Sequence, residues 1–165
     1  MDNPLWQFSL RYYRAEGVAA LYVDLQDHYG LNVNLLLWVQ WLAEQGVEID
    51  ETCIVQAQQQ IKYIHESYVQ PLRKIRRLQC KTQRQEQPSP VLKEALLAAE
   101  LLAEQQVQER LYQLSQPLLA SITLPATPPA AVAPDHNLNC YLTFHSAQHE
   151  LPKLMRCVQQ YSAGA

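Results

Sequence analysis

The feature that most constrains this chain is a nearly uninterrupted apolar segment, Leu35–Ala43. Leucine, valine, tryptophan and alanine fill it, and Gln40 is its one polar residue. A helix built from this segment has almost no polar face, so other elements must surround it. Asn32 or Asn34, just before the segment, is placed to cap that helix. The segment therefore predicts a central helix over about residues 33–45.

The composition also favours helices. Only four of the 165 residues are glycine, while leucine, alanine and glutamine are abundant, which argues against a sheet with glycine-rich turns. The net charge of −3 gives no general attraction to nucleic acid or membranes. The longest apolar run is about half of the ~20 residues that cross a bilayer. We therefore expect an all-α fold, a compact bundle of about five to six helices, with no membrane association.

Four widely spaced cysteines contain no CxxC pair, and a chain of this size needs no disulfide to fold. No apolar signal core follows the acidic N-terminal residues. These observations predict a cytoplasmic protein with free thiols.

Apolar periodicity places further helices on both sides of the central one. Two short helices are expected at about residues 4–14 and 17–29. A long helix begins at Asp50, and Pro71 should kink it because proline lacks an N–H and collides with the preceding turn. Another long helix should run from Pro90 to about Pro117. The two long helices are natural antiparallel partners.

Domain organisation follows from a change in composition. Residues 1–120 are expected to form the helical domain. Residues 121–134 are rich in proline, alanine and threonine, a composition typical of a linker. Residues 135–165 should form a loosely attached tail with short helices at about 138–145 and 151–161.

Two segments carry a resemblance to known proteins. Leu25–Trp38 reads LQDHYGLNVNLLLW and Pro71–Arg77 reads PLRKIRR, and Gly17–Ala19 precedes them. Together they resemble a family of small, uncharacterised proteobacterial proteins of unknown function, over roughly residues 4–118. The family commonly has Asp at the position of Asn32, so a role that depends on that carboxylate does not carry over. The resemblance implies a bacterial cytosolic setting and no particular chemistry.

The strongest functional candidate is a basic cluster in the second half of the kinked helix. Guanidinium groups bind phosphate and carboxylate in bidentate fashion, so the cluster could bind nucleic acid, a nucleotide or an acidic protein surface. The alternative is a solvated face whose arginines pair with Glu94, Glu100 or Glu104 on the adjacent helix. No aromatic residues lie between the members of the cluster. This argues against binding of single-stranded nucleic acid, because such sites stack the bases on aromatic side chains. Its members are Arg73, Lys74, Arg76, Arg77, Lys81 and Arg84.

A second candidate is a polar corner before the central helix. One interpretation is a ligand or enzyme site at Asp27, His28 and Asn34. The favoured interpretation is structural: Asp27 accepts backbone N–H groups of the central helix, and Asn34 caps it. The corner comprises Asp24, Asp27, His28, Asn32 and Asn34.

The remaining motifs predict neither a cofactor nor a metal. His145 and His149 have a spacing that occurs in metal sites, with Cys140 and Glu150 nearby, but the HExxH order is absent. The chain has no GxSxG elbow, phosphate loop or dinucleotide fingerprint. We therefore expect a non-enzymatic module that binds a protein partner, with nucleic acid as the alternative partner.

Overall fold

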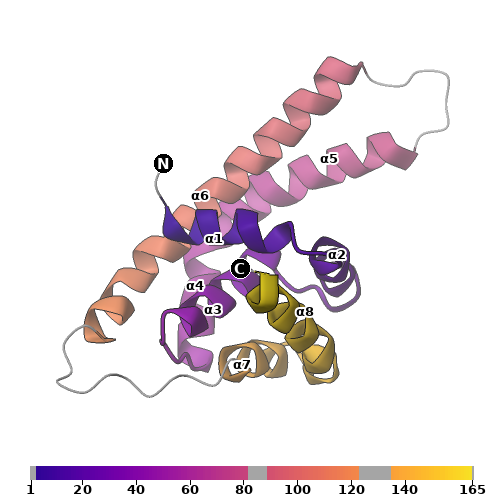
Figure 1. Ribbon diagram of the computed structural model, residues 1–165. Coiled ribbons are helices and arrows are strands. Elements are labelled where there is room, and N and C mark those ends of the chain that lie inside the picture. Colours follow the sequence, from indigo (N-terminus) through magenta and orange to yellow (C-terminus); the bar gives the residue numbers. More distant parts are fainter. Residues whose placement is uncertain (1–2, 82–88, 123–134, 165) are drawn as a thin grey trace.

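The computed structural model describes residues 3–81, 89–122 and 135–164, and this part of the chain is helical without strands (Figure 1). The all-α prediction is confirmed. Since α4, η1 and α5 form one continuous helix, the described residues contain seven helices rather than five or six. The elements are α1 (Pro4–Tyr13), α2 (Val18–Tyr29), α3 (Val33–Glu44), α4 (Glu51–Ile64), the π-helix η1 (His65–Val69), α5 (Gln70–Lys81), α6 (Pro90–Ile122), α7 (His136–Phe144), the 3-10 helix η2 (Gln148–Glu150) and α8 (Leu151–Gly164).

Helix α3 lies at the centre, as its sequence requires. All ten residues from Val33 to Leu42 are buried, and the helix contacts α1, α2, α6 and α7. Its polar residue Gln40 accepts a hydrogen bond from the Tyr22 hydroxyl at 2.5 Å. The Gln40 amide donates in turn to the Tyr12 hydroxyl at 3.2 Å. Burial of this glutamine is therefore compensated by hydrogen bonds.

Asn32 caps the central helix. Its side-chain oxygen accepts from the backbone N–H groups of Asn34 at 2.9 Å and Leu35 at 3.4 Å. Gly30 closes the preceding helix α2 with a φ of 66°, a conformation that glycine adopts at little cost. Of the two asparagines that the sequence offered as caps, the fold uses Asn32.

A π-helical turn accommodates Pro71. The turn η1 ends two residues before this proline, and the backbone N–H of Gln70 donates to the carbonyl of His65, five residues back. Proline has no N–H, and its ring would collide with the carbonyl of Ser67 in a regular helix. Widening the turn relieves that conflict. The irregularity expected at Pro71 is thus a π-turn within one continuous helix.

Helices α5 and α6 form an antiparallel hairpin that projects beyond the body of the protein (Figure 1). The predicted end of α6 near Pro117 is wrong, because the helix continues to Ile122. Leu118 and Leu119 in this extension pack on the core. Their packing holds the helix together although Pro117 lacks a hydrogen bond.

The C-terminal helices α7 and α8 lie in the core, although the sequence analysis expected a loosely attached tail. Leu138, Tyr141 and Leu142 of α7 and Leu154 of α8 are fully buried in the same cluster as α3. Residues 121 and 122 of the expected linker belong to α6, and residues 123–134 lie outside the described residues.

Asn137 joins α7 to the loop after α3. Its side-chain oxygen accepts from the Ile49 N–H at 3.0 Å. Its amide group donates to the carbonyls of Val39 at 3.1 Å and Val47 at 2.8 Å. This fully buried side chain pairs two backbone groups of the loop after α3 and also reaches a carbonyl inside that helix.

We expect Leu142→Ala to lower the free energy of unfolding by about 2–5 kcal/mol, because it leaves a cavity in the core. Leu102→Ala, at an exposed position of α6, is the matched control and should cost much less. Urea unfolding followed by circular dichroism measures both. Equal losses in the two variants would contradict the burial of α7.

Candidate binding site

Arg73 stands where the hairpin meets the body of the protein. From α5 it donates to Glu100 at 3.0 Å and to Glu104 at 2.5 Å, both on α6. It also donates to the side-chain oxygen of Gln26 on α2. The side chains of Arg73 and Glu100 are only 14% and 5% exposed. One guanidinium group thus connects three helices at a nearly buried position.

Two further arginines of α5 pair with carboxylates. Arg76 makes a bidentate contact with Glu100, at 2.5 and 3.1 Å. Arg77 donates to Asp27 of α2 at 2.8 Å, and this pair is exposed. Buried pairs are costly to break because the remaining charge stays desolvated, whereas exposed pairs contribute about 0–1 kcal/mol. The arginines nearest the body therefore mainly stabilise the fold.

The two glutamates of this cluster respond differently to burial. Burial opposes ionisation of Glu100, but the hydrogen bonds and charges of Arg76 and Arg73 outweigh it and lower its pKa. For Glu104 burial prevails over the attraction of Arg73, and its pKa is raised. The cluster holds one firmly ionised carboxylate and one that binds a proton more readily.

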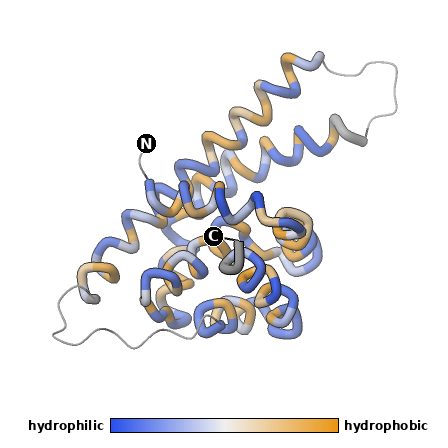
Figure 2. Tube along the Cα trace, viewed as in Figure 1, coloured by the Kyte–Doolittle hydropathy of each residue, from blue (hydrophilic) through white to orange (hydrophobic). Residues whose placement is uncertain are grey.

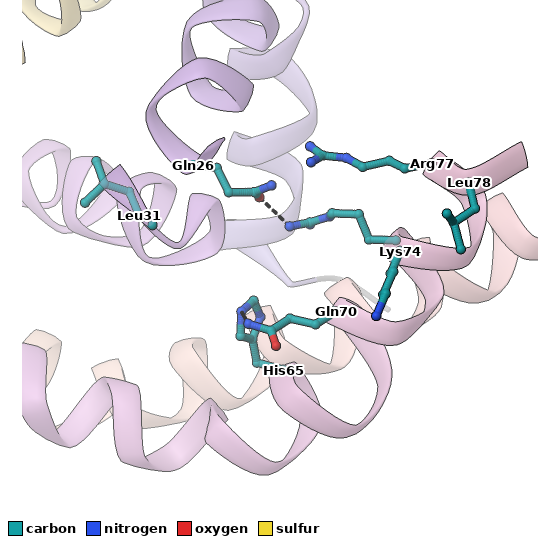
Figure 3. A pocket seen from close by; sticks show the side chains of 9 residues that line it. Gln26, Leu31, His65, Gln70, Lys74, Arg77 and Leu78 are labelled. Carbon is teal, nitrogen blue, oxygen red and sulfur yellow. Dashed lines mark hydrogen bonds between the residues drawn. The ribbon is translucent and has the colours of Figure 1, made fainter. Parts of the chain in front are cut away.

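An open cavity of about 380 Å³, here called the basic cavity, lies beside Arg73 (Figure 3). Arg73, Lys74, Arg77 and His65 line it, and none of the described residues in its lining is a carboxylate. Within the described chain, Lys74 has no carboxylate partner. Among the described residues, this cavity is therefore a place where the basic helix offers cations to an anionic ligand.

His65, in the π-turn, forms part of the wall of the basic cavity (Figure 3). Its Nδ1 lies 3.2 Å from the amide nitrogen of Asn32, whose oxygen already caps α3. The Asn32 amide must therefore donate to Nδ1, which requires a neutral imidazole. Burial, assisted by the charge of Arg73, lowers the pKa of His65 and favours the same state.

The predicted basic cluster does not form a single free cationic face. Arg73, Arg76 and Arg77 point to carboxylates, and two of the three glutamates named from sequence, Glu100 and Glu104, are among their partners. Lys81 ends α5, but its side chain lies outside the described residues, as does all of Arg84.

The polar corner does not converge on one site. Asp27 pairs with Arg77, which lowers the pKa of the Asp27 carboxyl through a hydrogen bond. His28 contacts the Asp24 carboxylate at 3.0 Å on the exposed surface. Asn34 is buried and accepts from Gln108 of α6. The expectation that Asp27 and Asn34 cap α3 is wrong, because Asn32 fills that role.

The histidines of the C-terminal segment lie apart. His149 and the Glu150 carboxylate both contact the Tyr29 hydroxyl, at 2.7 and 3.0 Å. His145 packs on Tyr141 instead, with ring centroids 4.8 Å apart. Cys140 joins neither group. The described residues contain no group of three or more His, Cys, Asp and Glu side chains that could hold a metal ion.

Comparison with known proteins adds a family. The model of a family described as "Protein of unknown function (DUF2390)" matches residues 4–111. The chain belongs to this family. The resemblance to an uncharacterised family inferred from the sequence is thereby confirmed, and the match brings no chemistry with it. No curated protein and no solved structure matches the chain. Among the described helices, none has the length and hydrophobicity to span a bilayer.

The ion-pair cluster predicts unequal costs for removing its arginines. Arg73→Met should lower the free energy of unfolding by about 3–5 kcal/mol, because it leaves Glu100 and Glu104 desolvated without that partner. Arg77→Met, the control, breaks an exposed pair and should cost about 1 kcal/mol or less. Chemical denaturation measures both, and a similar cost for the two would contradict a structural role for Arg73.

Stability should fall as the solution becomes acidic. Burial lowers the pKa values of His65 and His145 below the ordinary 6.5. In mildly acidic solution the unfolded chain therefore binds more protons at these histidines than the folded chain does. The contribution of these two histidines to the free energy of unfolding is fully present above pH 6.5. It is lost as the pH falls from 6.5 toward their lowered pKa values in the folded chain. The His65→Gln variant should show a shallower loss of unfolding free energy between pH 7 and 5. An unchanged slope would refute the contribution of His65.

Proposed function

We propose that this protein is a non-enzymatic, cytoplasmic interaction module that binds a protein partner through its projecting hairpin. The observation that carries the proposal is a set of exposed apolar side chains on α6, here called the hairpin apolar face. In Figure 2, hydrophobic residues recur along the arm of α6 that leaves the body. Val91 and Leu102 are 74% and 60% exposed. The hairpin apolar face comprises Val91, Leu92, Leu97, Leu101 and Leu102.

These residues span about three helical turns. A helix that is apolar around its circumference is normally buried on all sides. Among the described residues of the arm, α5 covers one side of α6, and burying the remaining apolar surface would gain about 25 cal/mol per Å². Exposed patches of this kind mark sites of protein association.

Helix α5 adds to the same arm. Its apolar residues Ile75 and Leu78 are both exposed because α5 extends beyond the body. The hairpin thus offers apolar side chains from both helices. This supports a partner that packs along the arm.

The alternatives have less support. Binding of nucleic acid would need free cations, and Arg73, Arg76 and Arg77 already have carboxylate partners. An enzyme site at the polar corner would need Asp27 and His28 to share a cavity with Asn34, and their contacts point in different directions. The basic cavity with Lys74 is what keeps phosphate binding as the second candidate.

We expect a Val91→Ser/Leu102→Ser variant to lose, by at least about tenfold, the recovery of partner proteins in affinity capture from bacterial extract, since the contact is apolar. Tyr63→Ser/Tyr68→Ser removes two other exposed apolar side chains, on α4 and η1, and is the matched control. Mass spectrometry compares the captured proteins. Identical captures from the wild type and both variants would contradict the proposal.

Salt separates the two candidate functions. Capture through the hairpin apolar face should persist when the salt concentration rises from 50 to 200 mM. Binding of a fluorescent DNA or RNA through the basic cavity would weaken steeply over that range and would weaken further in Lys74→Gln. If nucleic acid binds in this way and Val91→Ser/Leu102→Ser has no effect on protein capture, the result would favour phosphate binding through the basic cavity as the function.

A further inference from the structure

A second cavity of about 240 Å³, here called the inner cavity, shares Arg73 and Gln26 with the lining of the basic cavity. It is bounded by residues of α1, α2, α3, α5 and α6. Trp6, Tyr13 and Leu37 are among the residues that form its apolar walls. A cavity of about 150 Å³ accommodates benzene, so the inner cavity has room for one substituted ring.

A buried polar network forms part of the lining. The Ser9 hydroxyl lies 2.9 Å from the side-chain oxygen of Gln108, and the Gln108 amide donates to the Asn34 oxygen at 2.9 Å. Asn34 is 3% exposed. Its amide nitrogen has no partner among the described residues. This side-chain nitrogen is not one of the fully buried unpartnered atoms, so it keeps some contact with solvent and is available to donate to an acceptor that enters the cavity.

Glu104 supplies a complementary acceptor. It lies one helical turn from Gln108 on α6 and lines the same cavity. Its Oε1 accepts from Arg73, and its Oε2 has no partner among the described residues. Burial raises the pKa of this carboxyl. The inner cavity therefore presents one unused donor and one unused acceptor beside aromatic walls.

The charges of the lining select a neutral group. The arginines of the lining are already paired with carboxylates, so an ionic ligand would have to displace one of these ion pairs, whereas a neutral group leaves them intact. A hydroxyl accepts one hydrogen bond and donates another. We propose that the inner cavity binds a neutral aromatic ring that bears a hydroxyl, with this hydroxyl accepting from Asn34 and donating to Glu104.

This inference goes beyond the proposed function and does not depend on it. A phenol-type group has two sources, a free small molecule or the tyrosine side chain of a bound polypeptide. Leu97 and Leu101 of the hairpin apolar face also line the inner cavity, so a polypeptide on the arm could reach it.

The test is a titration of the full chain with p-cresol and with toluene, followed by nuclear magnetic resonance of the indole N–H groups. The Trp6 signal should shift and saturate with p-cresol. The Trp38 indole, which donates to Ser115 at 2.7 Å in the core, should stay in place. Toluene has the same ring and methyl group without the hydroxyl, and it should bind about tenfold more weakly.

Surface variants verify the place of binding without disturbing the core. Val23 is 42% exposed and lines the inner cavity, so Val23→Trp should obstruct it and abolish the p-cresol shift. Tyr63→Trp places the same side chain at another exposed position, on α4 and outside the lining, and should leave the titration unchanged. Loss of the shift in Tyr63→Trp, or its persistence in Val23→Trp, would place p-cresol elsewhere and overturn the assignment.

A capped Ala-Tyr-Ala peptide distinguishes the two sources. Binding comparable to that of p-cresol would support the site and assign it to tyrosine side chains. Binding of p-cresol alone would support the site and assign it to free small phenols. No shift of Trp6 with p-cresol, or toluene binding as tightly as p-cresol, would overturn the inference. None of these outcomes bears on the variants of Val91 and Leu102 that test the proposed function.

Discussion

Helix α3 has no face that water can solvate, and the rest of the fold follows from this constraint. Four helices surround it, and two of them come from the distant segments α6 and α7. Trp38 illustrates the result: its indole is fully buried and donates to Ser115 of α6. Gln40 is the exception within α3, and two tyrosine hydroxyls satisfy it. The core is therefore assembled by packing and completed by a few well-placed hydrogen bonds.

The same assembly explains why the basic segment, which the sequence suggests could bind a ligand, forms structural ion pairs in the fold. In the sequence its arginines resemble a phosphate-binding patch. In the fold, the antiparallel register of α5 and α6 brings Glu100 and Glu104 opposite Arg73 and Arg76. Ion pairs form because these charges lose water together and would be costly to bury separately. Among the members whose side chains the structure describes, Lys74 is the one without a carboxylate partner, and it lines the basic cavity together with Arg73 and Arg77.

Once α3 is buried and the arginines are paired, two kinds of surface are left that could bind a partner or a ligand. The arm of the hairpin keeps apolar side chains that no described element covers, which supports association with a protein. Arg73 and Gln26, which contact each other, line both an open, basic cavity and a more apolar one. His65, the first residue of the π-turn before Pro71, borders the basic cavity. Packing at the junction of hairpin and body thus creates both cavities.

The sequence by itself determined the helical class, the central position of α3 and the antiparallel pairing of the two long helices, because apolar periodicity is a local property of the chain. It predicted the pairing of arginines with glutamates as one of two alternatives. Only the tertiary structure decided that α7 and α8 join the core and that Asn137 holds the loop after α3. It alone also revealed the partnerless amide of Asn34. These features depend on contacts between residues tens of positions apart, and no local pattern specifies which of the available partners will meet.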